Sequence, residues 1–115
     1  MVVEMRTYRI KPGRREEFLH VFRSKSIPEH RRLGMQISDP LLSIEDPDVF
    51  FFMRGFPDAA SRERLRAAFY EGELWKLELE AKLMPMIEKF EVVLVDDPEH
   101  QAFSGNAVRS QEEPL

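Results

Sequence analysis

Four side chains with the potential for chemistry lie on two predicted strands. Glu4, Arg6 and Tyr8 alternate along VVEMRTYRI, and Arg54 lies near the end of VFFFMRGF. Successive side chains of a strand point to opposite faces, so the first three share one face. We expect them to meet Arg54 on the sheet face that carries no helices. There an arginine could hold a carboxylate or enolate oxygen, a buried glutamate could take a proton, and a tyrosine could donate one. These four residues are the candidate catalytic set.

The same four residues also fit a purely structural role. A buried Glu–Arg ion pair could fix the strand register or a subunit contact. Such a pair would persist without catalysis, because removing one partner typically costs about 3–5 kcal/mol. Structural ion-pair networks also shift pKa values, so a shifted pKa does not separate the two interpretations. Both stay open from the sequence.

The strand around Phe51 carries large apolar residues on both of its faces. Phe50 and Phe52 alternate with Arg54 and are assigned to the helix-free face, as candidate substrate contacts inside a barrel. A helix-covered face is expected to be apolar. The residues predicted to pack under the helices are therefore Val3, Met5, Phe51 and Met53.

Further candidates lie on the predicted helices. Phe22 and Trp75 are candidate substrate contacts, with plain core packing as the alternative. Tyr70 is expected to have its hydroxyl in solvent, with a position at the pocket rim as the alternative. A mixed set of charged residues on the same helix is expected to form a solvated face: Arg62, Glu63, Arg64 and Arg66.

The sequence predicts no metal and no cofactor. It contains no cysteine, and His20, His30 and His100 are not spaced as ligands of one ion. It also lacks a glycine-rich dinucleotide motif, a P-loop and a G-x-S-x-G motif.

Charge and hydropathy limit the partners. The net charge of −4 comes entirely from residues 96–115, so the rest of the chain is balanced and offers no basic stripe to nucleic acid. The chain begins directly with a strand pattern, so we expect no signal peptide. No apolar run approaches the roughly 20 residues that cross a bilayer. We expect no membrane association and a cytoplasmic location.

The order of the predicted elements defines the fold class. The pattern is βαββαβ, which favours an α+β ferredoxin-like plait: a four-stranded antiparallel sheet with its helices on one face. We expect one domain over 1–96 and a polar, acidic tail over 97–115. The predicted elements are strand 2–10, helix 14–33 interrupted near Pro28, strand 35–45 bent at Asp39-Pro40, strand 49–56, helix 59–71 capped by Asp58, helix 73–84 and strand 90–95.

The apolar residues on the helix-free face predict a homodimer. A monomer rarely exposes an apolar patch of that size, and a two-fold contact uses one patch twice. We therefore expect two sheets packed face to face. The acidic tail, with Phe103, is expected to cross onto the partner subunit.

Four sequence blocks resemble the NIPSNAP family. VVEMRTYRIKPGRREEFL resembles its opening E-x-R-x-Y strand and K-P-G turn, which places Glu4, Arg6 and Tyr8 on the family pattern. RRLG at 31–34, FMRGFPD at 52–58 and AFYEGELW at 68–75 resemble a bacterial branch. The resemblance covers about residues 2–95 and implies a dimeric α/β-barrel. That superfamily includes cofactor-free monooxygenases, cyclases, isomerases, haem-degrading enzymes and proteins without known chemistry.

Two functions remain open. In the first, the barrel binds a small hydrophobic, oxygenated molecule, with or without activity as a cofactor-independent oxygenase, cyclase or isomerase. In the second, the chain is a non-catalytic structural or interaction module with a packed barrel core. A cavity of a few hundred Å³ beside Arg54 or Tyr8 would favour the first. A barrel filled by Phe50, Phe52 and Tyr8 would favour the second.

Overall fold

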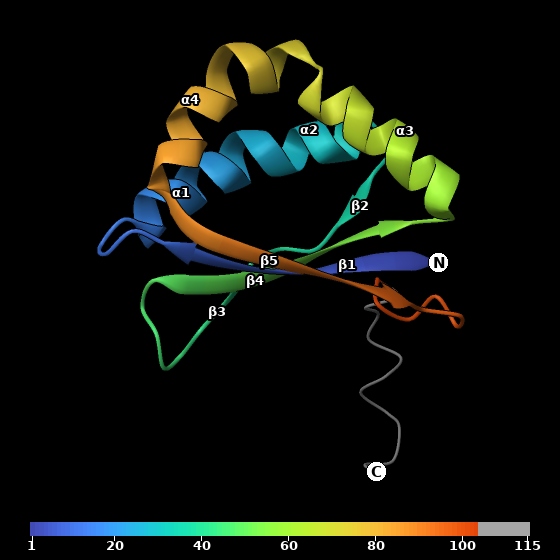
Figure 1. Cartoon of the computed structure of the whole chain (residues 1–115), viewed down its shortest axis with the longest axis horizontal. Helices are drawn as coiled ribbons and strands as arrows, with labels where there is room; N and C mark the ends of the chain where they lie inside the picture. Colours follow the sequence, from blue (N-terminus) through green and yellow to red (C-terminus); the bar gives the residue numbers. More distant parts are fainter. Residues whose placement is uncertain (104–115) are drawn as a thin grey trace.

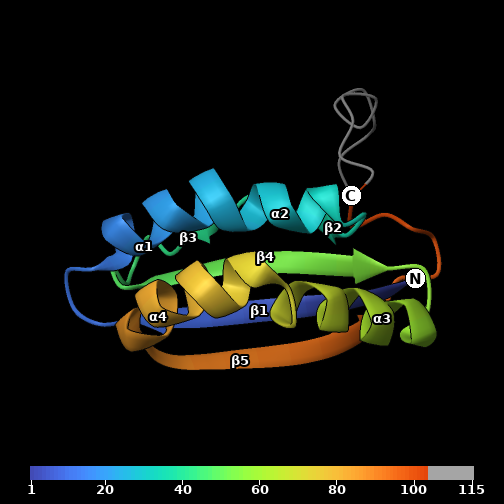
Figure 2. The same cartoon turned by 90° about the horizontal axis from the view of Figure 1, so that it is seen from above.

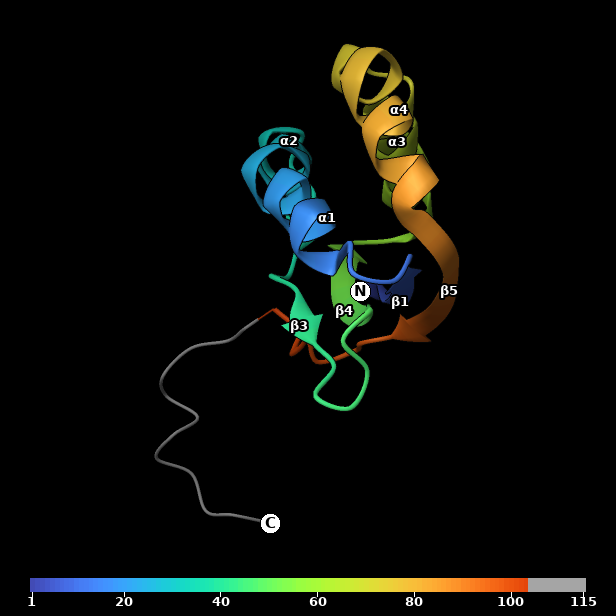
Figure 3. The ribbon, with the colours of Figure 1, turned by 90° about the vertical axis from the view of Figure 1, so that its left-hand side faces the viewer.

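One antiparallel sheet carries two helical runs on the same face (Figures 1 and 3). A computed structural model describes residues 1–103 of the chain. Figure 2 shows the two runs lying side by side along the strands. The elements are β1 (Val2–Ile10), α1 (Arg15–Val21), a π-helical segment (Phe22–Ser26), α2 (Ile27–Arg32), β2 (Gln36–Ile37), β3 (Leu41–Leu42), β4 (Val49–Phe56), α3 (Ala59–Tyr70), a second π-helical segment (Trp75–Leu79), α4 (Glu80–Leu83), a 3₁₀ turn (Met84–Met86) and β5 (Ile87–Asp96).

The sheet confirms the predicted ferredoxin-like plait. Its strand order is β2-β4-β1-β5, with β1 antiparallel to both β4 and β5. The strand count is five because the predicted strand 35–45 divides into β2 and β3, which both pair with β4. The division falls at the Asp39-Pro40 bend, where proline cannot donate to a ladder.

The first helical run follows the predicted range and ends at Gly34. The interruption expected near Pro28 takes the form of the π-helical segment, in which the Ile27 N–H reaches back five residues to the Phe22 carbonyl. Gly34 has a φ of 93°, the left-handed conformation that glycine adopts without strain.

The second helical run begins at the predicted cap. The Asp58 carboxylate accepts a hydrogen bond from the Ser61 N–H at 2.7 Å. The run breaks at Gly72, where a Cβ would lie 2.9 Å from the Ala68 carbonyl oxygen. A side chain does not fit at this bend.

The predicted assignment of the strand faces was wrong. Glu4 and Arg6 are buried beneath the helices, and Tyr8 lines a cavity there with helical residues. Met5 and Phe51, expected under the helices, are 43% and 40% exposed on the opposite face. The helix-covered face tolerates the charges because they form ion pairs with one another.

The correction extends along β4. Phe50 and Phe52 belong to the core under the helices rather than to a barrel interior. Met53 lies on the helix-free face, paired with Met5 of β1. Val3 shares that face, yet it is buried beside its strand partner Gly55.

The start of the tail lies on its own chain. Phe103 lies against Gly55, where an added Cβ would also come within 2.8 Å of the Met1 side chain. The expected crossing of the tail onto a partner subunit stays a prediction. Residues 104–115 of the predicted tail lie outside the described residues.

Candidate ligand-binding site

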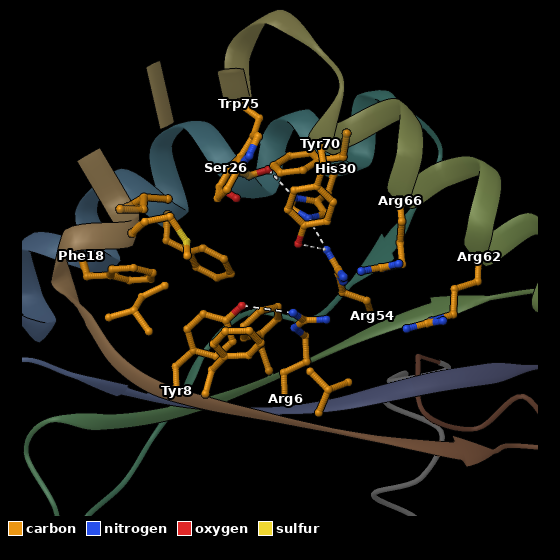
Figure 4. A pocket seen from close by; sticks show the side chains of 18 residues that line it. Arg6, Tyr8, Phe18, Ser26, His30, Arg54, Arg62, Arg66, Tyr70 and Trp75 are labelled. Atoms are coloured by element: carbon orange, nitrogen blue, oxygen red, sulfur yellow. Dashed lines mark hydrogen bonds between the residues drawn. The ribbon is translucent and has the colours of Figure 1, made fainter. Parts of the chain in front are cut away.

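A cavity of about 320 Å³ lies between the sheet and the helical runs (Figure 4). Both helical runs and three strands contribute to its wall, so the plait itself positions the site. Its aromatic lining residues are Tyr8, Phe18, Phe22, Phe52, Phe69, Tyr70, Trp75 and Phe90.

Four arginines surround a single buried carboxylate at one end of this cavity. Glu4 Oε1 accepts from Arg6 Nη1 and from Arg54 Nε, both at 2.6 Å. Glu4 Oε2 accepts from Arg62 Nε at 2.8 Å, and Arg66 Nε lies 3.7 Å from the same oxygen. Two strands and one helix thus bring their charges to one carboxylate. We call these five residues the arginine cluster.

The carboxylate of the cluster is held in its ionised form. Burial alone would raise the pKa of Glu4, but the hydrogen bonds and charges of Arg54 and Arg6 lower it to about 2. Glu4 is therefore a structural anion near neutral pH. It is a poor general base, because a base works best when its pKa lies near the operating pH.

Positive charge remains in excess around Glu4. Arg6 and Arg54 are 6% and 1% exposed, whereas the side chains of Arg62 and Arg66 are 19% and 35% exposed. Among the described residues, the cavity lining includes all four arginines and no acidic side chain. The two fully buried cations face one buried anion, which leaves one buried positive charge uncompensated.

Three guanidinium nitrogens of the cluster have no hydrogen-bond partner within the described chain. They are Arg6 Nε, Arg54 Nη2 and Arg66 Nε, and all three are buried. Leaving a buried donor unpaired costs about 1–3 kcal/mol, and more when it is charged. All three belong to arginines that line the charged end of the cavity, where an anion would meet an excess of positive charge.

His30 supports the cluster from the first helical run. Its Nδ1 lies 2.7 Å from the Ser26 carbonyl oxygen, and its Nε2 lies 3.1 Å from Arg54 Nη1. Arginine can only donate, so Nε2 must accept and Nδ1 must carry the proton. Burial, together with the charge of Arg54, lowers the pKa of His30 to about 4. The imidazole is therefore neutral, and its lone pair is already engaged.

Two tyrosine hydroxyls adjoin the arginines. Arg6 Nη2 donates to the Tyr8 hydroxyl at 3.2 Å, and Arg54 Nη1 donates to the Tyr70 hydroxyl at 3.0 Å. Burial raises the pKa of Tyr8, so its hydroxyl keeps its proton. The charged end of the cavity thus offers only donors toward the interior.

The structure brings together the four residues predicted as a catalytic set. Glu4, Arg6 and Arg54 share direct ion pairs, and Tyr8 joins them through Arg6. They meet under the helices, not on the helix-free face. Glu4 lies behind the arginines and is not part of the cavity lining.

The predicted substrate contacts divide into two groups. Phe22, Phe52 and Trp75 line the cavity. Phe50 is fully buried behind them, with its ring centroid 5.7 Å from that of Phe22 and 5.9 Å from that of Phe52. It packs as core.

Sequence reasoning missed four residues at the charged end of the site. Arg62, Arg66 and Tyr70 were assigned to solvent, and His30 was given no role. Arg62, Arg66 and Tyr70 are spaced four residues apart on α3, so they form one stripe of the helix. The four-residue spacing could have grouped these three residues from the sequence alone. Arg64 lies between Arg62 and Arg66 in the sequence but points away from this stripe and is exposed.

Two other kinds of feature are absent from the part of the chain that the structure describes. Within residues 1–103, no three His, Asp or Glu side chains are grouped so that they could hold a metal ion. No helix in the same range has the length and apolar character that crossing a membrane requires.

Comparisons with solved structures establish the fold. An uncharacterized NIPSNAP domain protein from Burkholderia xenovorans is 22% identical, with a TM-score of 0.77 over 92% of this chain and 100% of that one. A NIPSNAP family protein from Agrobacterium tumefaciens is 23% identical, with a TM-score of 0.76 over 89% and 97%. A putative antibiotic biosynthesis monooxygenase from Nitrosomonas europaea is 19% identical, with a TM-score of 0.66 over 85% and 99%.

The sequence itself identifies the family. No curated protein matches the chain. The NIPSNAP family model matches residues 3–96, which include every strand-borne member of the arginine cluster and both helical runs. The chain therefore belongs to the NIPSNAP family.

Proposed function

We propose that this protein binds a small amphipathic organic anion in the cavity between its sheet and its helices. The observation that carries the proposal is that four arginines line the cavity, while none of the described acidic side chains does: Arg6, Arg54, Arg62 and Arg66. An oxyanion at this end of the cavity would lie among several guanidinium groups. Hydrogen bonds from guanidinium to carboxylate are among the stronger ones in proteins.

The charge of the cluster favours a single negative charge on the ligand. The fully buried groups are Arg6, Arg54 and Glu4, which together carry one excess positive charge. Arg62 and Arg66 are partly exposed, so water screens much of their charge. A carboxylate or an enolate supplies the one charge that the buried groups lack.

The rest of the cavity fits an apolar body with rings. Figure 4 shows the arginines toward the α3 end and Phe18 toward the end near α1, with Trp75 above. A volume of about 320 Å³ is near the lower limit for small-molecule pockets, which are roughly 300–1,000 Å³. The ligand would therefore be compact, with its anionic group at the arginines and its body among the aromatic side chains.

Catalysis is the second candidate function, as a cofactor-independent oxygenase, cyclase or isomerase. The specific observation in its favour is that guanidinium and hydroxyl groups line the same end of the cavity, and such donors can stabilise an enolate oxygen. Neither titratable candidate is poised as a base, since Glu4 has a pKa of about 2 and the His30 lone pair is engaged by Arg54. Binding therefore ranks ahead of acid–base chemistry.

The test uses Trp75, the one tryptophan of the chain, as a reporter inside the cavity. Its fluorescence is followed while 4-phenylbutyrate or the uncharged 4-phenylbutan-1-ol is added. We expect the acid to bind at least about tenfold more tightly than the alcohol, because one charge-assisted contact is worth about that factor. Negative-ion mass spectrometry of extracted protein would identify a co-purified acid.

A matched pair of variants locates the binding. Arg66→Ala removes a partly exposed member of the cluster and should weaken the acid about tenfold. Arg64→Ala, on the same helix but outside the cavity lining, should leave the affinity unchanged. Equal affinity for the acid and the alcohol, or equal loss in the two variants, would contradict the proposal.

We also infer that a second copy of the chain covers the helix-free sheet face. That face exposes apolar side chains on three strands: Met5 at 43%, Phe51 at 40%, Val93 at 57% and Val95 at 38%. A patch of this kind is rarely left in water, and an isologous contact would bury it twice. Light scattering at micromolar concentration should give the mass of a dimer, and a monomeric mass would refute this inference.

The alternative to ligand binding is a non-catalytic structural or interaction module. That alternative predicted a barrel filled by Phe50, Phe52 and Tyr8, but these residues lie under the helices. A cavity beside Tyr8 and Arg54 was the feature expected to favour ligand binding. Support for the proposal thus comes from the helix-covered side of the sheet.

A further inference from the structure

Two tyrosine hydroxyls point into the cavity from opposite walls. Figure 4 shows the Tyr8 hydroxyl rising from the sheet and the Tyr70 hydroxyl descending from α3. Tyr8 accepts a hydrogen bond from Arg6 at 3.2 Å, and Tyr70 accepts one from Arg54 at 3.0 Å. In each hydroxyl, one lone pair of the oxygen therefore accepts a hydrogen bond from a guanidinium group.

This arrangement determines what each hydroxyl can still do. A phenolic hydroxyl has one proton to donate, and a guanidinium cannot accept it. Among the hydrogen bonds within residues 1–103, neither hydroxyl donates to a protein acceptor. A hydroxyl that accepts from a charged donor is polarised and donates more strongly. Tyr8 and Tyr70 thus present two polarised donors to the cavity.

We infer that these two hydroxyls form a second recognition point, which binds an uncharged carbonyl oxygen on the body of the ligand. The ligand class is then an oxo acid with an apolar, ring-bearing body, whose carboxylate lies at Arg6, Arg54 and Arg66. This inference rests on the proposed function, because it assigns a second oxygen to the same bound anion.

A carbonyl fits these donors better than the other oxygen groups. Its oxygen has two lone pairs and no proton, so it can accept from both hydroxyls at once. An alcohol on the ligand would bring a proton of its own to a region whose charged lining is entirely arginine. A ligand without the second oxygen would bury both hydroxyl protons without an acceptor. Sites built for a polar group reject analogues lacking it for that reason.

The experiment compares two keto acids with their deoxo partners. The pairs are 4-oxo-4-phenylbutyrate with 4-phenylbutyrate, and phenylpyruvate with 3-phenylpropionate, each titrated calorimetrically into the full-length protein. The pairs differ in the distance between carboxylate and ketone. We expect at least one keto acid to bind about tenfold or more tightly than its partner, the factor set by a well-placed hydrogen bond.

Two variants assign the gain to the hydroxyls. Tyr8→Phe and Tyr70→Phe keep the aromatic wall and remove one hydroxyl each. Each should weaken the preferred keto acid about tenfold and remove most of its preference over the deoxo partner. The wild-type comparison of acids needs no variant, so a variant that fails to fold does not remove the test.

The possible failures separate the two proposals. If the keto and deoxo acids bind equally in both pairs, and all lose affinity in Arg66→Ala, the second recognition point is overturned and anion binding stands. If none of the four acids binds the wild-type protein, both proposals are overturned. A keto-acid preference that survives loss of both hydroxyls would also overturn the role of Tyr8 and Tyr70.

Discussion

Replacing Glu4 with glutamine tests whether the arginine cluster is organised around one carboxylate. The change keeps the side-chain volume but removes the negative charge that accepts from Arg6, Arg54 and Arg62. The pKa of Glu4 falls from 4.5 to about 2 on folding, a shift that corresponds to about 3 kcal/mol of stability near neutral pH. Glu4→Gln should therefore lower the free energy of unfolding by about 3 kcal/mol, within the range for breaking a buried ion pair.

The same prediction has a pH signature. Because the folded-state pKa of Glu4 is depressed, its contribution is fully present above about pH 4.5 and is lost as the pH falls toward 2. Near pH 3 the wild-type protein should already have lost about 2 kcal/mol of it, so the wild type and Glu4→Gln should converge. Urea unfolding at one fixed protein concentration measures both values.

A control separates the buried carboxylate from an exposed one. The Glu63 side chain also contacts Arg62, at 3.7 Å, but is 75% exposed. Glu63→Gln should change the free energy of unfolding by no more than about 1 kcal/mol, as exposed pairs do. If Glu4→Gln were no more destabilising than Glu63→Gln, or if its effect were the same near pH 3 as at neutral pH, this reasoning would be refuted.

Three further predictions follow from local contacts. The pKa of His30 should remain near 4, well below 6.5, so nitrogen-detected NMR should show a proton on Nδ1 and no titration between about pH 5 and 8; a midpoint near 6.5 would contradict the contact with Arg54. Gly55→Ala should lower the unfolding midpoint because its Cβ meets Phe103, and adding Phe103→Ala should remove most of that further cost; strictly additive effects would place Phe103 elsewhere. Asp58→Ala should cost about 1 kcal/mol through loss of the helix cap, and a neutral effect in urea unfolding would show that the cap is dispensable.

The fold was predictable because its signals are local. Strand alternation, the Asp58 cap and the Asp39-Pro40 bend each act over a few residues, and the structure retains all of them. Local signals do not fix how a bend is made, so the π-helical segment before Pro28 was not foreseen.

The face assignment failed because it relied on a rule of burial. The rule placed the apolar Val3 and Met5 under the helices and the polar Glu4 and Arg6 outside. In β4 both faces are rich in large apolar side chains, so the strand offers no counter-signal. The covered face of β1 can be polar because Glu4 forms ion pairs there with Arg6 and Arg54.

The arginines of α3 were misplaced for a related reason. Charged residues on a helix usually lie in water, and Arg64 does. Arg62 and Arg66 turn inward because their guanidinium groups pair with the carboxylate of Glu4. Glu4 lies 58 residues before Arg62 in the sequence. Sequence spacing could have grouped Arg62 and Arg66 with Tyr70, but it could not reveal an acceptor on a distant strand.

The most direct test of the central claim is a crystal structure with 4-(4-bromophenyl)butyrate bound. The account predicts an anomalous bromine peak between Phe18 and Trp75, with the carboxylate hydrogen-bonded to Arg6, Arg54 and Arg66. A bromine peak at the arginine end, or bound acid only on the protein surface, would contradict the claim that this cavity holds an organic anion by its arginine cluster.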